Sequence, residues 1–283
     1  MWNNRNGGNR MRAVERTTLL GCYRCGAFSK AVATIRSLPK GIGRRTVALA
    51  AGWLLCVFAG TALGEGDLHW FTLHEYVVQL NQLRVSFGLP PLKLNWALCE
   101  AAQAQANEVL IVQECSHVDR KGRRADRRAL EAGYPFSILA ENLAAGQPTW
   151  ERALEGWLNS PSHRMAMLAP DYREVGIGSA WGTGKRFTHA WAQVLGTRRG
   201  VYPLIIELDA LWTDSPRVRL YVHGAQYASA VRFSNDGEQW TDWMPPKEWM
   251  DWELPNEPGE HTVFVQLRIR GRIYESSDSI LLR

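Results

Sequence analysis

Cysteine is scarce in this sequence of 283 residues, which has five, and only Cys99 and Cys115 lie after residue 64. This excludes a disulfide framework, so the body of the chain is predicted to depend on its hydrophobic core. If both cysteines lay on one helix, sixteen positions apart, about 24 Å would separate them, and a bridge would require the helix to end early and the chain to fold back. Cys22 and Cys25 form one CxxC pair without a second pair, which does not support a zinc site.

Acidic residues are nearly absent from residues 1–45, which hold ten of the 33 Lys and Arg and one acid, Glu15. The rest of the chain carries 23 basic and 27 acidic side chains, so the net charge of +5 belongs to this basic leader. A mildly acidic body gives no electrostatic reason to expect a nucleic-acid partner. The leader also lacks sustained periodicity, and we expect either a disordered tail or residues that precede the true start codon.

Charge is missing from residues 46–64, whose apolar run reads TVALAAGWLLCVFAGTAL. Arg44 and Arg45 precede the run and small residues end it, which is typical of a secretory signal cleaved after Ala62 or Gly64. The alternative is an uncleaved membrane anchor, because about 18 apolar residues is the lower limit for spanning a bilayer. In both cases the body is exported, so the sequence predicts a secreted, periplasmic or cell-surface protein.

Helical patterns dominate the body up to about residue 198. Apolar spacing predicts a first helix over 72–88 that begins at a capping box of Thr72 and Glu75, and a second over 95–112 capped by Asn95. Further helices are predicted over 126–132, 149–159 and 161–168, and strands over 175–181 and 187–195. The last strand alternates, with Trp191, Gln193 and Leu195 on one side and Ala190, Ala192 and Val194 on the other. Helices followed by a hairpin indicate an α+β domain.

Short strands take over from residue 201, after a boundary near 198–202. They are predicted over 204–209, 217–222, 228–234, 241–244, 261–270 and 273–282, which indicates an all-β sandwich. Trp240, Trp243, Trp249 and Trp252 cluster in this region. Exposed, they would form a platform for stacking glycans; buried, they would belong to the sandwich core, which is the interpretation that we favour because such domains bury large aromatic residues.

A series of short segments lies in a fixed order along residues 73–196: Leu80–Arg84, Leu92–Asn95, Ala101–Gln103, Ser116–Gly122, Asp126–Arg127, Ala132–Tyr134, Glu141–Asn142, Trp157–Arg164, Val175–Gly178 and Trp191–Val194. With these segments the region resembles the CAP superfamily (SCP-like extracellular domain; cysteine-rich secretory, antigen 5 and pathogenesis-related proteins), and its bacterial branch above all. Their order and spacing together carry the resemblance. It implies an α-β-α sandwich over residues 70–198.

The resemblance also implies a cleft, which in eukaryotic members holds two histidines and two acids. His117 and Glu141 match two of these positions, whereas the second acid and the second histidine are missing near Asn159 and Ala190. His163 belongs instead to the bacterial Ser-Pro-x-His-Arg motif. Residues 201–283 resemble an immunoglobulin-like domain of exported bacterial proteins, through the segments Val231–Gly237 and Gly259–Gln266 and through Trp240.

Two imidazoles and one carboxylate, from His117, His163 and Glu141, can hold Zn²⁺ or a similar divalent ion. The alternatives are a hydrogen-bonded polar cluster that fixes the cleft and a direct acid–base role. His163 falls in the first turn of a predicted helix, whose positive dipole end favours the neutral imidazole. The expected cleft residues are His117, Asp119, Glu141, Asn142, Ser160, His163 and Gln193.

No nucleophile elbow is present, and the adjacency of Ser116 and His117 does not make a catalytic triad. The sequence therefore favours an exported protein that binds a lipid, glycan or protein ligand. Its one candidate cofactor is a divalent metal. A metal-assisted hydrolase of the cell envelope is the alternative, which would use Glu141 or Asp119 as the base.

Overall fold

The computed structural model describes residues 65–183 and 185–283. The basic leader and the apolar run of residues 46–64 lie outside the described residues, so the predicted signal or anchor stays a prediction. Residues 64–283 form one compact unit. Within its described part, no helix combines the length and the apolar character needed to cross a bilayer.

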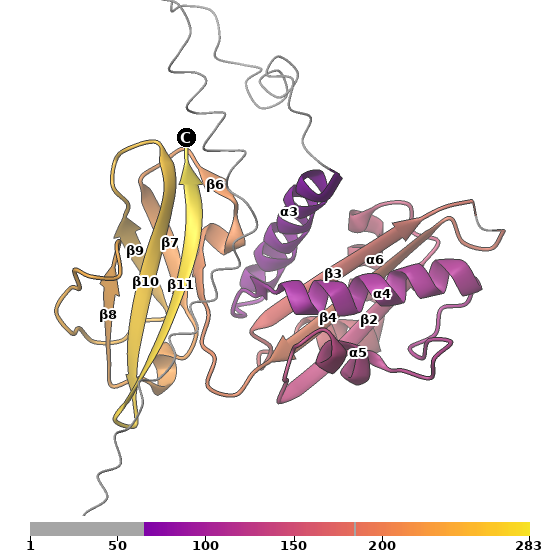
Figure 1. Cartoon of the computed structure of the whole chain (residues 1–283), viewed down its shortest axis with the longest axis horizontal. Coiled ribbons are helices and arrows are strands. Elements are labelled where there is room, and N and C mark those ends of the chain that lie inside the picture. Colours follow the sequence, from indigo (N-terminus) through magenta and orange to yellow (C-terminus); the bar gives the residue numbers. More distant parts are fainter. Residues whose placement is uncertain (1–64, 184) are drawn as a thin grey trace, which may run out of the picture. The chain divides into compact units, whose positions relative to one another are not determined.

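A four-stranded sheet between two layers of helices forms the first half of this unit (Figure 1). The sheet has the order β1-β3-β4-β2, and only β1 and β3 are parallel. The strands are β1 (Lys93–Leu94), β2 (Ile138–Ala145), β3 (Glu174–Trp181) and β4 (His189–Thr197). The helices are α3 (Glu65–Ser86), α4 (Trp96–Val112), α5 (Ala125–Glu131), α6 (Trp150–Asn159) and α7 (Pro161–Met167).

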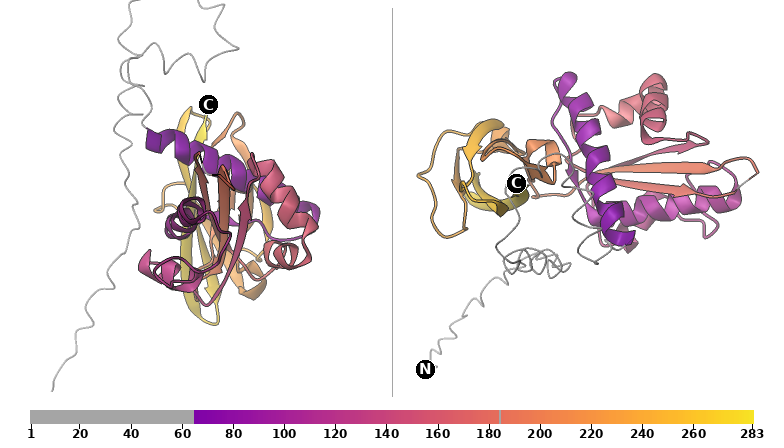
Figure 2. Two further views of the ribbon diagram at one scale, coloured as in Figure 1. Left: turned by 90° about the vertical axis from the view of Figure 1, so that its right-hand side faces the viewer. Right: turned by 90° about the horizontal axis from the view of Figure 1, so that it is seen from above.

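The alternation along β4 sorts its side chains between two cores, as predicted. Trp191 and Leu195 pack in one core with residues of α3, α6 and α7. Ala192 and Val194 pack in the other, against α4 and α5. Figure 2 shows helices on both sides of the sheet, so the predicted α-β-α arrangement is confirmed.

Two glycines of β3 allow α4 to lie directly on the sheet. A Cβ atom at Gly176 would lie 2.0 Å from the carbonyl carbon of Leu98, and one at Gly178 would lie 2.3 Å from the backbone nitrogen of Gln103. Ala101 and Ala102 on α4 are buried at this contact. The Val-Gly-Ile-Gly segment is therefore a packing requirement of the fold, because no larger residue leaves room for the helix backbone.

Two local predictions agree with the structure, one is wrong and one strand was missed. Asn95 caps α4 by accepting a hydrogen bond from Leu98 N at 3.2 Å. The predicted capping box at Thr72 is wrong, because α3 is already helical at Glu65 and runs through that position. Strand β2 was not predicted, since its polar residues interrupt the apolar pattern. Neither Cys99 nor Cys115 forms a disulfide, as expected from their separation.

Two sheets around one hydrophobic core form the second half of the unit (Figure 1). One has the order β5-β7-β9, with β5 (Leu204–Ile206), β7 (Arg217–Val222) and β9 (Trp249–Glu253). The other has the order β6-β11-β10-β8, with β6 (Trp212–Thr213), β8 (Ala230–Ser234), β10 (Gly259–Ile269) and β11 (Arg272–Leu282). Short 3₁₀ turns are η1 (Glu207–Asp209) and η2 (Ala225–Tyr227). An all-β region is thus confirmed, whereas its immunoglobulin-like identity and the domain boundary stay predictions.

The tryptophan-rich segment differs from its prediction. Residues 241–244 make only an isolated bridge between Met244 and Val231. The strand in this segment is β9 instead. The four tryptophans are half-buried and are absent from the buried core. Arg232 and Arg268 lie over the Trp243 ring at 4.7 and 4.2 Å, so its ring stacks on guanidinium groups on the sheet surface rather than in the interior.

A buried cluster of charges joins the two halves. Lys93 Nζ lies 2.5 Å from Asp209 Oδ1 and also contacts Asp278. Asp209 further accepts a hydrogen bond from Leu94 N at 2.8 Å, and Asp278 accepts one from Ile206 N at 2.8 Å. Burial alone would lower the pKa of Lys93, but the two carboxylates raise it above its usual value. The lysine is therefore charged, as a pairing with two aspartates requires.

Two further hydrogen bonds extend this cluster. The ring Nε2 of His223 donates to Pro91 O at 2.8 Å, and burial lowers the pKa of His223 to about 3, which keeps the ring neutral. Asn81 Nδ2 donates to Leu208 O at 2.9 Å. We call the set of Asn81, Pro91, Lys93, Asp209, His223 and Asp278 the polar seam.

Candidate functional site

Strand β2 presents two neighbouring polar residues on opposite faces of the sheet. Glu141 pairs with Val194 of β4 and shares its face with α5, whereas Asn142 pairs with Gln193 and shares its face with α7. Because β2 is the edge strand of the sheet, the loop that carries His117 can reach Glu141. The site thus draws on β2, α5, α7 and the loop after α4.

Glu141 is fully engaged by two side chains. Its Oε1 lies 2.8 Å from His117 Nδ1, and its Oε2 accepts a hydrogen bond from Arg128 Nη2. The side chains of Glu141 and Arg128 are 3% and 2% exposed, whereas that of His117 is 52% exposed. A carboxylate only accepts hydrogen bonds, so the His117 proton lies on Nδ1 and the neutral ring keeps Nε2 as an acceptor.

His163 sits in the first turn of α7 and is held from its own helix. Its Nδ1 lies 2.8 Å from the hydroxyl of Ser160, the residue that precedes the helix. Burial lowers the pKa of His163, and the positive charge that His117 carries when it is protonated lowers this pKa further. The predicted neutral imidazole is therefore favoured, with desolvation and the second histidine as the causes.

Asn142 and Gln193 support His163 from the sheet. Asn142 Nδ2 donates to His163 O at 3.1 Å and to Gln193 Oε1 at 3.0 Å. Both amides are buried, and Gln193 Nε2 has no hydrogen-bond partner among the described residues. These two residues therefore fix the position of α7, and one buried donor remains unused.

Asp119 stands apart from this group. Its carboxylate accepts hydrogen bonds from Lys121 N, Arg123 N and Arg123 Nε at 2.8–2.9 Å. Burial would raise the pKa of Asp119, but these hydrogen bonds hold it below its usual value. The carboxylate closes its own turn, and these hydrogen bonds do not reach His117 or Glu141. Its predicted role as a cleft residue or base has no support in these contacts.

The three predicted metal ligands do not fit a shared ion as they are placed. Both carboxylate oxygens of Glu141 are used by His117 and Arg128. No three His, Cys, Asp or Glu side chains in the described part of the chain are grouped to hold a metal. The arrangement fits the alternative interpretation, a hydrogen-bonded polar cluster.

Arg128 is the important residue that sequence reasoning missed. It lies on α5, where its Nη1 also donates to Arg123 O at 2.9 Å. Five arginines occur between residues 120 and 128, and no spacing rule distinguishes the one that faces the sheet. Its neighbour Ala129 is buried, which is the only local signal that this side of the short helix points inward.

The interaction between the two histidines predicts a measurable shift in the pKa of His163. In His117→Gln, the pKa of His163 is expected to rise but to stay below its ordinary value of 6.5, because burial is the larger cause. Folding lowers this pKa, so His163 contributes stability that is fully present above 6.5 and is lost as the pH falls through the folded value. NMR titration of the imidazole Cε1 proton measures the midpoint. The control is His189→Gln, which should leave that midpoint unchanged.

Comparison with known proteins identifies the first half. The family model of the Cysteine-rich secretory protein family (CAP) matches residues 78–195. The uncharacterized membrane protein YlbC of Bacillus subtilis is 34% identical over 98 residues, which are 35% of this chain and 28% of that protein. The uncharacterized protein YkwD of the same species is 29% identical over 103 residues, or 36% and 40%. The match therefore spans less than half the length of either relative.

Two solved structures show weaker likeness. An extracellular protein containing a SCP domain from Bacillus anthracis is 21% identical, with a TM-score of 0.40 over 44% of this chain and 40% of that chain. An outer surface protein from Borrelia burgdorferi is 24% identical, with a TM-score of 0.38 over 43% and 88%.

Proposed function

Residues 78–195 of this chain are a CAP domain, and on that premise we propose that the protein is exported and binds a polar ligand of the cell envelope at its histidine surface. This surface consists of His117 and His163. Export is supported by the apolar run of residues 46–63 behind a basic flank. Among the similar proteins, YlbC is named a membrane protein, which agrees with a protein of the cell envelope.

The pairing of Glu141 carries the proposal. With one oxygen bonded to Arg128 and the other to His117, the carboxylate holds an imidazole in place and is itself only 3% exposed. What remains outward is the Nε2 acceptor of the half-exposed His117 ring and the edge of His163. Such a pair suits hydrogen bonds to hydroxyl or amide groups, which glycans, lipid headgroups and proteins all carry. No three His, Cys, Asp or Glu side chains of the described residues are grouped to hold a metal, which argues against the alternative, a metal-assisted hydrolase.

Binding to envelope material tests the proposal. Purified protein is sedimented separately with cell-wall sacculi and with vesicles of extracted lipids. We expect one of the two to retain the wild type, and His117→Ala/His163→Ala to lose that retention. His261→Ala is the matched control, because His261 lies on β10 and bonds only locally, to Glu257 O at 2.7 Å. Equal retention of the double variant and the control would contradict the proposal.

Zinc titration separates the polar cluster from the metal site. By calorimetry, wild type, His117→Ala and His163→Ala are expected to give the same Zn²⁺ isotherm, because no three ligand side chains among the described residues are grouped to hold the ion. Stoichiometric binding that is lost in both variants would instead establish the metal site.

A further inference from the structure

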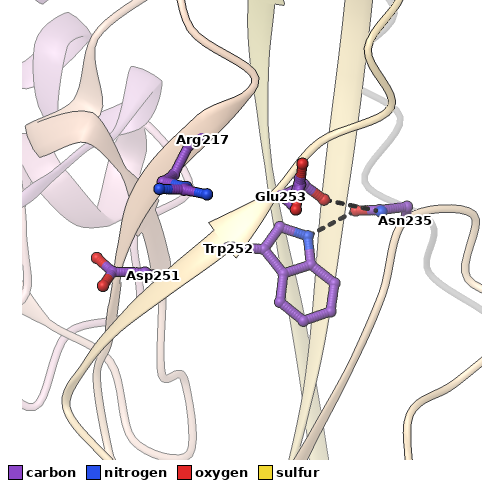
Figure 3. Close-up of a pocket in the computed structure, with 5 residues that line it drawn as sticks. All are labelled: Arg217, Asn235, Asp251, Trp252 and Glu253. Atoms are coloured by element: carbon purple, nitrogen blue, oxygen red, sulfur yellow. Dashed lines mark hydrogen bonds between the residues drawn. The ribbon is translucent and has the colours of Figure 1, made fainter.

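An open pocket of about 510 Å³ lies beside β9 in the second half of the chain. It is lined by Arg217, Asn235, Asp251, Trp252 and Glu253 (Figure 3). Arg217 is the cross-strand partner of Glu253, and Asp251 is the partner of Arg219. The volume is within the range of small-ligand sites.

A second pocket of about 360 Å³ adjoins the first. It is lined by Arg219, Lys247, Trp249, Met250 and Asp251, so the two pockets share Asp251. Together they follow the whole of β9, which covers about 14 Å at about 3.4 Å per step. We call this pair of pockets the β9 groove. Its length suits a chain of a few sugar rings.

The indole of Trp252 is fixed in place at the groove. Its Nε1 donates to Asn235 Oδ1 at 2.7 Å, and Asn235 Nδ2 donates to Glu253 O at 3.3 Å. Its ring centroid lies 5.3 Å from that of Phe233 in the core. The ring is therefore held from one edge and packed from the inside. It lies on the core-facing side of β9, opposite to Asp251 and Glu253, and forms the rigid wall of the pocket at the edge of the strand.

The charged side chains of the first pocket are not used by the fold. Arg217, Asp251 and Glu253 are exposed, and within residues 65–183 and 185–283 no side-chain hydrogen bond or ion pair is found for any of them. Figure 3 shows no bond between Arg217 and either acid, although Arg217 and Glu253 are directly opposite in register. Opposite charges at such positions usually pair, so these donors and acceptors are available to a ligand.

We propose that the β9 groove binds a neutral oligosaccharide. The apolar face of a sugar ring packs against an indole such as that of Trp252, while its hydroxyls both donate and accept hydrogen bonds. Carboxylates accept from such hydroxyls and guanidinium groups donate to them. The lining has three basic residues (Arg217, Arg219, Lys247) and two acidic ones (Asp251, Glu253). This mixture selects neither a strongly anionic nor a cationic ligand.

An added peptide strand is the competing occupant, because β9 is the edge strand of its sheet. The strand has five residues, two of them outward-facing acids, and Asn235 already bonds Glu253 O at its end. Short, charged edges are those that proteins use to prevent strand addition. These features favour the sugar.

Calorimetric titration of the whole chain with cellotetraose, chitotetraose and maltotetraose tests the proposal. We expect at least one to bind, and Arg217→Gln/Asp251→Asn to bind about tenfold more weakly or worse. Both positions are exposed, so this variant is expected to fold as the wild type does. Trp252→Phe, which keeps the contact with Phe233, should also weaken binding. Trp181→Ala, at a position 71% exposed on β3, is the tryptophan control.

The outcomes are distinct. Binding that is unchanged in Arg217→Gln/Asp251→Asn, or no binding of any of the three sugars, would overturn the proposal. Binding of an extended valine-rich peptide in their place would establish strand addition and overturn it too. Sugar binding that disappears in His117→Ala/His163→Ala would assign it to the histidine surface, whereas we expect that variant to bind sugar normally.

Discussion

Replacing Arg128 by methionine is expected to lower the free energy of unfolding by about 3–5 kcal/mol. Among the described residues, Arg128 is the one cation that contacts Glu141 Oε2, so the change leaves a carboxylate that is 3% exposed without a full partner. Methionine keeps most of the volume, so the cost comes from the charge. Chemical denaturation at neutral pH measures it.

A double-mutant cycle isolates the interaction energy between Arg128 and Glu141. Arg128→Met/Glu141→Gln should recover about 1–3 kcal/mol relative to Arg128→Met, because the buried charge is gone. Arg127→Met, on the same helix, is the matched control. Its side chain is 65% exposed and bonds Glu131 one turn away, and such pairs contribute at most about 1 kcal/mol. If Arg128→Met were no more harmful than Arg127→Met, the Glu141 pairing would not be a structural element of the site.

Replacing Gly178 by alanine is expected to cost about 3 kcal/mol or more, since overpacking against a rigid backbone has no relief. The new Cβ would lie 2.3 Å from Gln103 N and 2.4 Å from Ala102 C. Either α4 or β3 must move, and with them the face of the sheet that holds Glu141. Thermal unfolding monitored by circular dichroism measures the loss.

Substitution of Gly156 by alanine is expected to change the stability in the opposite direction. Gly156 is exposed in the middle of α6, and the nearest atom to a Cβ there is Gln147 Nε2 at 3.9 Å. Gly156→Ala should therefore stabilise the protein by about 0.5–1 kcal/mol. A destabilised Gly156→Ala, or a neutral Gly178→Ala, would contradict the packing described for α4 and β3.

Local physics explains why much of the first half could be predicted. The caps of α4 and α6 are set by Asn95 and Thr149, whose side chains bond a backbone N–H three residues on. The two faces of β4 follow from strict alternation between residues 190 and 195. In each case the deciding contacts lie within a few residues or obey a fixed period.

The missed elements depend on distant partners instead. Strand β2 carries Glu141 and Asn142 in the middle of its run, and hydrogen bonds to distant partners make their burial acceptable. These partners are Arg128, His117, Gln193 and the backbone of His163. Sequence alone cannot supply those partners. The resemblance put His117 and Glu141 in one cleft, and the structure brings His117 Nδ1 to 2.8 Å from Glu141 Oε1. The resemblance did not show that Arg128 bonds the second oxygen.

The tryptophans of the second half were assigned to the core for their size. The alternative fate of an indole, stacking under arginine, depends on neighbours across the sheet such as Arg232 and Arg268. Strand β9 was missed for a related reason. Its polar and aromatic residues line the β9 groove, so the sequence pattern does not show which side of the strand faces solvent and which faces the core.

The polar seam predicts how the protein behaves after a protease cuts the segment between its two halves. Arg173 Nη1 bonds Val201 O at 2.7 Å and its guanidinium lies 4.5 Å from the ring of Tyr202, so the connecting segment is itself held down. A cut in that segment would leave Lys93 between Asp209 and Asp278, and His223 on Pro91. The nicked chain would elute from gel filtration as one particle, and its two fragments would separate only in denaturant.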